Sequence, residues 1–289
     1  MTRAVYVSTN CFSDRTPAGI RRAVTKLAIT HLELSDVQAE PTAAVSLARD
    51  LYRDGVRVLI HNYFPAPVVP FLLNLASTDP KTLRKSREHC TRAIELSAEL
   101  EAPFFAAHAG YLLELPPAFL GQPEAQREFC RRNAKSGAML RASENFFESV
   151  AALIAAGSRH GVAFLIENHV AGEDLGRNAA KTLLLGLCSD QILEWGASIN
   201  GFGLLLDMGH LRCTARTMCF DPKNFCEVVG PLVRAFHLSD NNGRVDQHRP
   251  FNRSAWFLDF VKIRKENPIT LEFNAPQVGD LAAARALLV

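Results

Sequence analysis

Three observations predict that this chain folds as a single (β/α)8 barrel over residues 1–289. Its length of 289 residues is close to the roughly 250 residues of a typical barrel. Eight short apolar runs alternate with longer segments of helical character along the chain. The composition shows no break that would separate two domains. Alternation of this kind is typical of a parallel sheet covered by helices.

The expected strands are short apolar runs, most of which end at a polar residue. They are residues 5–8, 31–35, 57–61, 103–108, 162–167, 203–207, 232–238 and 269–273. The expected helices show helical spacing of apolar residues or begin at a proline, as at Asp79-Pro80. They are residues 18–27, 41–53, 79–100, 141–160, 179–195, 221–229, 254–266 and 279–289.

The connection over residues 109–139 is too long for an ordinary turn of an α/β unit. It contains the segment Leu112-Leu-Glu-Leu-Pro-Pro117. Connections of this length are usually functional or partly helical insertions. We therefore expect residues 109–139 to form a lid over a site at the barrel mouth.

A doubly wound open sheet is the main alternative architecture. Such a sheet carries a glycine-rich phosphate-binding turn after its first strand. Here the segment from Thr9 to Gly19 matches neither GxGxxG nor GxxxxGK followed by Ser or Thr. The closed barrel is therefore favoured.

Charge, cysteine content and hydropathy restrict the class of protein. A formal net charge of +2 and a pI of about 8.2 argue against an extended basic surface for nucleic acid. The seven cysteines are scattered without CxxC spacing, which indicates a reducing compartment rather than a disulfide framework or a thiolate zinc site. No signal-like start and no apolar run of about 18 residues is visible. We expect a soluble cytoplasmic protein without a membrane partner.

Side chains of metal-ligand type stand where six successive strands end. In a barrel these ends open on one face, where active sites of this fold lie. Imidazole and carboxylate groups together suit a divalent ion, with Zn²⁺ or Mn²⁺ preferred and Mg²⁺ or Co²⁺ as further candidates. A cation also removes the repulsion among converging carboxylates. The six residues are His61, His108, Glu167, Asp207, His237 and Glu272.

Each of these residues also has an ordinary structural explanation. A histidine can be a hydrogen-bonded core residue, an aspartate can cap the next helix, and a glutamate can pair with an arginine. Six of them at equivalent positions favour the metal site, because buried charge has to be paired or metal-bound.

Three further candidates lie in two loops. His210 follows Asp207 in a turn that contains glycine, and Asp246 and His248 are two residues apart after the seventh strand. They could form a second or third metal site, or they could hydrogen-bond a polar substrate. For Asp240 in the same loop, a solvated turn is the favoured interpretation.

The strand-end set resembles the xylose isomerase-like barrel superfamily, which includes sugar epimerases and isomerases and the endonuclease IV family of abasic-site nucleases. The resemblance implies a four-ligand metal site, common to both groups, at Glu167, Asp207, His237 and Glu272. It also implies the two further metal sites of the nucleases, completed by His61 and His108 and by His210, Asp246 and His248. The segment Asn74-Leu-Ala-Ser77 resembles a nuclease segment after the third strand.

Two departures from the nuclease pattern favour the sugar enzymes. The spacing from His237 to Asp246 is shorter than in the nucleases. After His248 the chain continues Arg-Pro-Phe-Asn rather than Gly-Glu-Gly. The loop from Asp240 to His248 instead resembles proteins labelled sugar phosphate isomerase/epimerase.

The resemblance therefore implies a divalent-metal-dependent isomerase or epimerase of a sugar or sugar phosphate, in carbohydrate metabolism. In the resembling epimerases two glutamates on opposite sides of the sugar exchange its proton, a role that falls here to Glu167 and Glu272. The residues expected to contact the substrate are His210, Arg244, Tyr63 and Trp256.

Two other functions remain as alternatives. One is an endonuclease IV-like multi-metal phosphodiesterase acting on abasic DNA, and only in this case would nucleic acid be a partner. The other is a non-catalytic binding protein, because a fold does not determine a function. An oligomer is compatible with the sequence.

Overall fold

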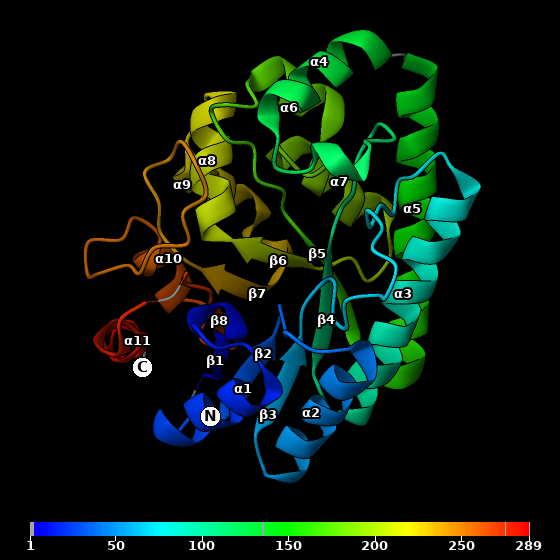
Figure 1. The fold of residues 1–289 in the computed structure, drawn as a ribbon. Helices are drawn as coiled ribbons and strands as arrows, with labels where there is room; N and C mark the ends of the chain where they lie inside the picture. The colour runs from blue at the N-terminus through cyan, green and yellow to red at the C-terminus, as the bar shows by residue number, and fades with distance from the viewer. Residues whose placement is uncertain (1–2, 135, 275, 289) are drawn as a thin grey trace.

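The computed structural model describes residues 3–134, 136–274 and 276–288. All eight of its strands are parallel and lie in the order β3-β2-β1-β8-β7-β6-β5-β4. A bridge between His61 and Ala106 joins β3 to β4 and closes the ring. The predicted (β/α)8 barrel is therefore confirmed (Figure 1). The strands are β1 (Val5–Ser8), β2 (His31–Leu34), β3 (Arg57–Ile60), β4 (Phe104–His108), β5 (Ala163–Glu167), β6 (Leu204–Asp207), β7 (Val233–Leu238) and β8 (Ile269–Leu271).

Helices surround the strands, and several begin at a proline, whose missing N–H costs nothing in the first turn. Side chains of Thr16, Asp79 and Asp221 accept the free N–H groups at three of these starts. The helices are α1 (Pro17–Lys26), α2 (Pro41–Arg53), α3 (Pro80–Glu99), α4 (Pro123–Asn133), α5 (Ser136–His160), α6 (Arg177–Leu183), α7 (Ser189–Ser198), α8 (Met208–Met218), α9 (Pro222–Val229), α10 (Leu258–Lys262) and α11 (Val278–Ala286), with 3-10 turns η1 (Thr9–Cys11), η2 (Pro117–Phe119) and η3 (Gly230–Leu232).

Three helix predictions need correction. The helix expected over residues 179–195 is broken into α6 and α7, because Gly186 has a φ of +74° and Leu184 pairs with Tyr111 instead of continuing the helix. The helix expected over residues 254–266 is only α10, and before it the Asn252 side chain accepts from the Ser254 N–H in a turn. Helix α5 begins at Ser136, earlier than the predicted residue 141.

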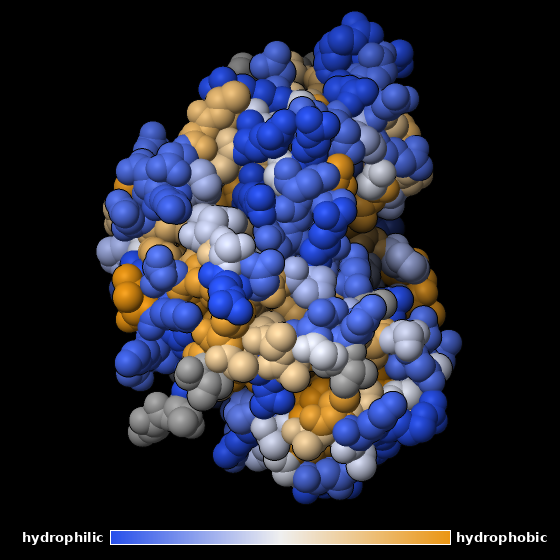
Figure 2. All heavy atoms as spheres, turned by 90° about the vertical axis from the view of Figure 1, so that its left-hand side faces the viewer, coloured by the Kyte–Doolittle hydropathy of each residue, from blue (hydrophilic) through white to orange (hydrophobic). Residues whose placement is uncertain are grey.

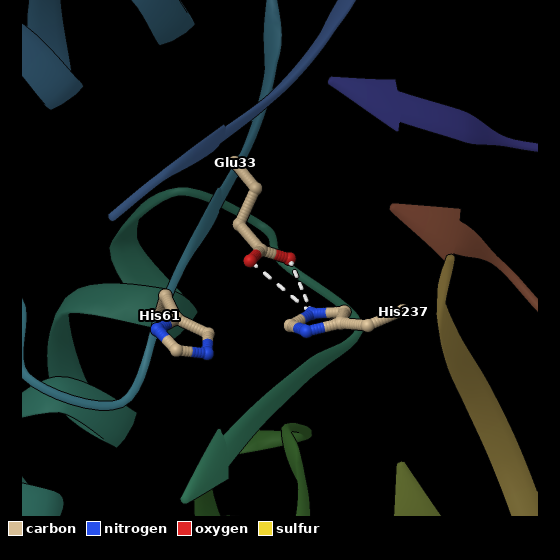
Figure 3. Close-up of side chains that lie close together, drawn as sticks. All are labelled: Glu33, His61 and His237. Carbon is tan, nitrogen blue, oxygen red and sulfur yellow. Dashed lines mark hydrogen bonds and ion pairs between the residues drawn. The ribbon is translucent and has the colours of Figure 1, made fainter. Parts of the chain in front are cut away.

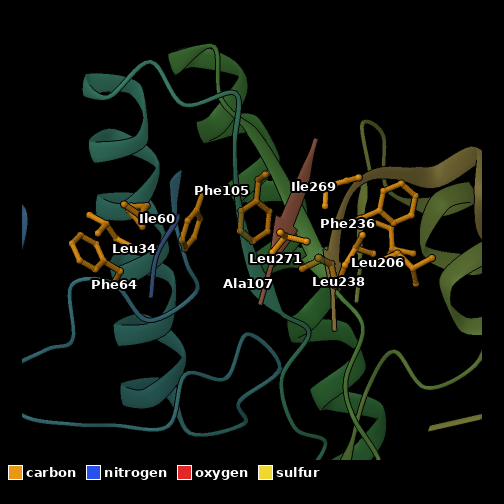
Figure 4. Packing of buried hydrophobic residues seen from close by; sticks show 14 of the residues in the cluster. Leu34, Ile60, Phe64, Phe105, Ala107, Leu206, Phe236, Leu238, Ile269 and Leu271 are labelled. Atoms are coloured by element: carbon orange, nitrogen blue, oxygen red, sulfur yellow. The ribbon is translucent and has the colours of Figure 1, made fainter. Parts of the chain in front are cut away.

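Two apolar clusters distinguish the outer from the inner face of the barrel strands. Side chains such as Leu34, Phe105 and Leu206 belong to the main core between strands and helices (Figure 4). A separate cluster of strand residues with the opposite parity fills the barrel interior. Its members include Leu59, Ala106, Leu165, Leu205 and Ala235.

This parity explains why the polar strand ends meet. Side chains two residues apart on a strand point to the same face. The positions two residues after the five interior residues just given are His61, His108, Glu167, Asp207 and His237. All five therefore point from the barrel interior into its C-terminal mouth.

Residues 109–139 contain η2 and α4 and pack against the connection that follows β5. Leu113 and Cys130 of this insertion share an apolar cluster with Ala180 and Leu183 of α6. Both segments leave the C-terminal ends of strands, so the insertion lies on the face that carries the site. Closure over a substrate stays a prediction.

Two polar side chains fasten the start of the insertion. Asn74, from the segment that resembles the nucleases, donates to the carbonyl of Tyr111 at 3.0 Å and accepts its N–H at 2.8 Å. The Glu114 carboxylate accepts from Ser77 Oγ at 2.8 Å and from the Asp79 N–H at 3.2 Å, just before α3. In this structure Asn74 thus supports the backbone around the mouth.

None of the helices in the described ranges is long and apolar enough to cross a bilayer. On the face shown in Figure 2, hydrophilic side chains predominate, and apolar groups form smaller patches between them.

Candidate metal centre

His237 lies at the centre of the site, with one ring nitrogen surrounded by carboxylates. Its Nδ1 is 3.5 Å from Glu167 Oε1, 3.9 Å from Asp207 Oδ2 and 3.2 Å from Glu272 Oε2. One nitrogen carries at most one hydrogen, so it cannot satisfy three carboxylates. Nδ1, Glu167 Oε1 and Asp207 Oδ2 are all buried without a hydrogen-bond partner. A divalent cation among these four residues would satisfy all of them, so the donor set fits a metal.

Asp207 is both a helix cap and a candidate ligand. Its Oδ1 accepts from the N–H of His210 at 2.7 Å and so caps α8. Its backbone is held by Asn168, whose side chain accepts from Asp207 N at 2.8 Å and donates to Asp207 O at 3.1 Å. The cap uses one oxygen and leaves Oδ2 aimed at His237.

His210 lies in the first turn of α8 rather than in the predicted loop. The glycine before it, Gly209, is part of this helix and does not mark a turn. A Cβ on Gly209 would come to 2.5 Å from Ser239 Oγ. Glycine is needed for the close approach of the loop after β7. Helix α8 consequently begins directly at the end of β6 and places His210 at the mouth.

Glu167 stands between two groups of imidazoles. Its Oε2 is 3.4 Å from His61 Nε2 and 3.8 Å from His108 Nδ1. Its Oε1 faces His237 Nδ1 and His210 Nδ1, each at 3.5 Å. The two oxygens of one carboxylate thus point toward different sets of candidate ligands. This is the arrangement of a carboxylate that can bridge two cations.

A third group consists of His210, Asp246 and His248. The Nε2 atoms of the two histidines lie 3.2 and 2.9 Å from Asp246 Oδ2. Their Nδ1 atoms lie 3.0 Å from the Asn168 carbonyl and 3.2 Å from the Glu272 carbonyl, respectively. A carbonyl only accepts, so each Nδ1 donates to it, and each Nε2 is the nitrogen that would bind a cation at Asp246, in place of the hydrogen that the carboxylate accepts without one. Histidines held in this way are typical of metal ligands.

Burial and neighbouring charges shift the pKa values in the site. Burial raises the pKa of Asp207 to about 6, with the charge of His210 opposing the shift. Burial also acts to raise the pKa of Glu272, but the nearby ring of His237, whose Nδ1 lies 3.2 Å from Oε2, brings it down to about 2. Burial lowers the pKa of His108 to about 4. At neutral pH this ring is therefore uncharged, as a metal-binding imidazole has to be.

The four residues expected to contact the substrate have different surroundings in the structure. His210 lies within the site. The Tyr63 hydroxyl donates to the Phe71 carbonyl at 2.6 Å, and Arg244 pairs with Glu173 at 3.3 Å with 61% of its side chain exposed. Trp256 packs against the main core with its Nε1 buried and unpaired. Contact of Tyr63, Arg244 and Trp256 with a substrate stays a prediction.

Asp240 does not behave as a solvated turn residue alone. Its carboxylate forms an ion pair with Arg212 of α8, and its backbone pairs with Arg249 in both directions at 2.8 and 2.7 Å. These bonds close the loop that carries Asp246 and His248. Asp240 therefore supports the third group from outside.

Two polar residues of the site were not among the sequence candidates. Asn10 donates from Nδ2 to Glu272 Oε1 at 3.0 Å. Glu33 of β2 is 1% exposed and lies 3.2 Å from His237 Nε2. Neither residue is the last residue of a strand, so the strand-end pattern does not identify them. A signal for Glu33 was available, since an acidic residue with inward parity in a buried strand needs a partner.

The sequence itself decides the family. Residues 22–287 match the family model described as xylose isomerase-like TIM barrel. The chain belongs to this family. No curated protein has a significantly similar sequence.

Solved structures with the same fold cover nearly the whole chain. A D-tagatose 3-epimerase-like protein has a TM-score of 0.71 at 18% identity, covering 100% of this chain and 96% of its own. A D-psicose 3-epimerase from Clostridium cellulolyticum, solved with D-tagatose, has a TM-score of 0.66 at 11% identity, with 100% and 99% covered. A Thermus thermophilus protein, TTHB071, soaked with ZnCl2, has a TM-score of 0.59 at 19% identity, with 98% and 97% covered. At these identities the likeness shows the fold.

Proposed function

We propose that this protein is a divalent-metal-dependent isomerase or epimerase of a sugar or sugar phosphate. The observation that supports it most is the convergence of three buried carboxylates on His237 Nδ1 at the barrel mouth. Family membership and the sugar epimerases among the structural neighbours agree with this assignment.

The metal would be held by Glu167, Asp207, His237 and Glu272. A divalent ion there supplies a Lewis acid, which makes the C–H beside a carbonyl more acidic. Glu272 faces His237 with Oε2, where its carboxylate can accept that proton, while Asn10 holds its other oxygen. Glu167 would return a proton from the opposite side of the sugar. Its oxygens are crowded by four imidazoles, so we assign the larger share of proton transfer to Glu272.

The test is product formation from ketoses. Purified protein would be dialysed against Zn²⁺ or Mn²⁺ and incubated with D-tagatose, D-psicose and ketose phosphates, and the sugars would be separated by chromatography. We expect an epimer or isomer of one of them to appear only in the metal-loaded sample. Cleavage of an abasic-site duplex without conversion of any sugar would overturn the assignment.

A multi-metal phosphodiesterase is the second candidate, and the position of Glu167 favours it. Its two oxygens face separate imidazole groups, and the two additional sites would be formed with His61 and His108 and with His210, Asp246 and His248. If Glu167 bridges two cations, it is poorly placed to act as a free base. The number of ions in the centre therefore bears on the reaction.

Metal counting on a double variant separates these two arrangements. We expect His61→Ala with His108→Ala to retain about one ion per chain, because four protein ligands suffice for a site at His237. The measurement is elemental analysis of wild type and variant after identical dialysis, with His160→Ala, on α5, as the control. Loss of all metal from the double variant would indicate one interdependent cluster and would favour the phosphodiesterase.

A further inference from the structure

Glu33 is a buried carboxylate below the proposed metal ligands. It lies on β2 with 1% of its surface exposed, and its register partner on β3 is Leu59, two residues before His61. Glu33 thus belongs to the inner layer of the barrel beneath the mouth. A charge in this position needs a partner.

That partner is the ring of His237. Each carboxylate oxygen of Glu33 lies 3.2 Å from His237 Nε2, and Figure 3 shows the carboxylate facing this edge of the ring. Thr270 of β8, the register partner of His237, donates from Oγ1 to Glu33 Oε2 at 2.7 Å. Two hydrogen bonds therefore fix the carboxylate against the ring.

The two nitrogens of His237 consequently have different tasks. A carboxylate is an acceptor, so Nε2 carries a hydrogen and donates it to Glu33. The nitrogen on the other side of the ring, Nδ1, faces the carboxylates of Glu167, Asp207 and Glu272. We propose that Glu33 is a positioning residue that fixes the orientation and tautomer of His237 and so presents Nδ1 to a divalent cation. Carboxylates in this relation to a metal-binding histidine also increase its basicity.

A role for Glu33 as a direct ligand fits the geometry less well. Ligand atoms of Glu33, His61 and His237 do lie within 4.8 Å of one another. Such a site would use His237 Nε2, however, and would leave Nδ1 without a cation among three carboxylates. The Thr270 hydroxyl already occupies one Glu33 oxygen. The Nδ1 side has more candidate ligands, so we assign the cation to it.

Zinc affinity tests the inference without an activity assay, and it rests only on the metal-site part of the proposed function. Glu33→Gln keeps the shape of the side chain but removes its charge. We expect it to weaken zinc binding about 10- to 100-fold, the usual effect of losing such a partner. The dissociation constant would be measured by competition with a chromophoric chelator. The control is Glu40→Gln, which makes the same charge change on the exposed surface.

Two further measurements keep the inference falsifiable. Thr270→Val removes one hydrogen bond to Glu33 but leaves its charge, so it should weaken zinc binding by a smaller factor. If Glu33→Gln does not fold, Thr270→Val alone tests the proposal. Nitrogen NMR of ¹⁵N-histidine-labelled, zinc-loaded protein should show a proton on His237 Nε2. Unchanged zinc affinity in folded Glu33→Gln and in Thr270→Val would overturn the proposal, and so would zinc bound to Nε2. Absence of sugar conversion by wild type would affect only the proposed reaction.

Discussion

Glu272→Gln is expected to lower the turnover of a converted ketose by about 10³-fold, within the range that positioned acid–base groups contribute. Glutamine keeps the length of the side chain and its bond from Asn10, but it cannot take a proton and is a weaker ligand beside His237. The fold should be preserved. Turnover and thermal unfolding would be measured on the same preparations.

The matched control is Glu266→Gln, a change in an exposed glutamate shortly before β8. It should behave as wild type in both measurements. Wild-type turnover by Glu272→Gln would remove Glu272 from the mechanism. Loss of turnover together with a large fall in the melting temperature of the chelator-treated variant, relative to chelator-treated wild type, would indicate a structural role instead.

Removal of the metal is expected to lower the melting temperature by about 8 °C or more. An ion present at 1,000 times its dissociation constant stabilises the folded state by about 4 kcal/mol, and each 1 kcal/mol corresponds to about 2 °C in a domain of this size. The reason lies in the buried atoms without partners, Glu167 Oε1, Asp207 Oδ2 and His237 Nδ1. Calorimetry of chelator-treated and zinc-loaded protein measures the shift.

Asp207→Asn is the matched variant for this experiment. Asparagine can still cap α8 through its side-chain oxygen, so the helix start is kept, but the negative charge facing His237 Nδ1 is lost. The shift on adding zinc should then be much smaller than in wild type. Equal melting temperatures of wild type with and without metal would contradict a site among these residues.

The alternation of apolar runs with helical segments predicted the barrel correctly, and the strand ends predicted most of the residues that the structure places at its mouth. Both predictions depend on properties of the local sequence. Strand parity is set by the chain itself, so an interior residue such as Leu165 determines the direction of Glu167 two positions later. The prediction of one helix over residues 179–195 was wrong because the break in it depends on the pairing of Leu184 with Tyr111, which is distant in sequence. Contacts of this kind leave no trace in local periodicity.

In the candidate site, too, features set by local sequence were predicted and features set by distant contacts were not. The strand-end residues were found because their position on the strand decides where they point. The inward parity of Glu33 on a buried strand indicates that it needs a partner, but its partners Thr270 and His237 come from other strands and are identified only in the structure. Gly209 was taken as part of a turn because the approach of Ser239 is not visible in the sequence. Residues that act through a neighbour from another strand require the folded structure.

Hydrogen exchange with solvent during sugar conversion tests the central claim most directly. Metal-loaded protein would be incubated in D2O with D-tagatose, D-psicose and ketose phosphates, and the sugars would be followed by proton NMR. The account predicts that the hydrogen beside the carbonyl of a converted ketose is replaced by deuterium, and that chelation or Glu272→Gln stops the replacement. Retention of this hydrogen in every sugar by fully metal-loaded protein, together with cleavage of an abasic-site duplex, would contradict it.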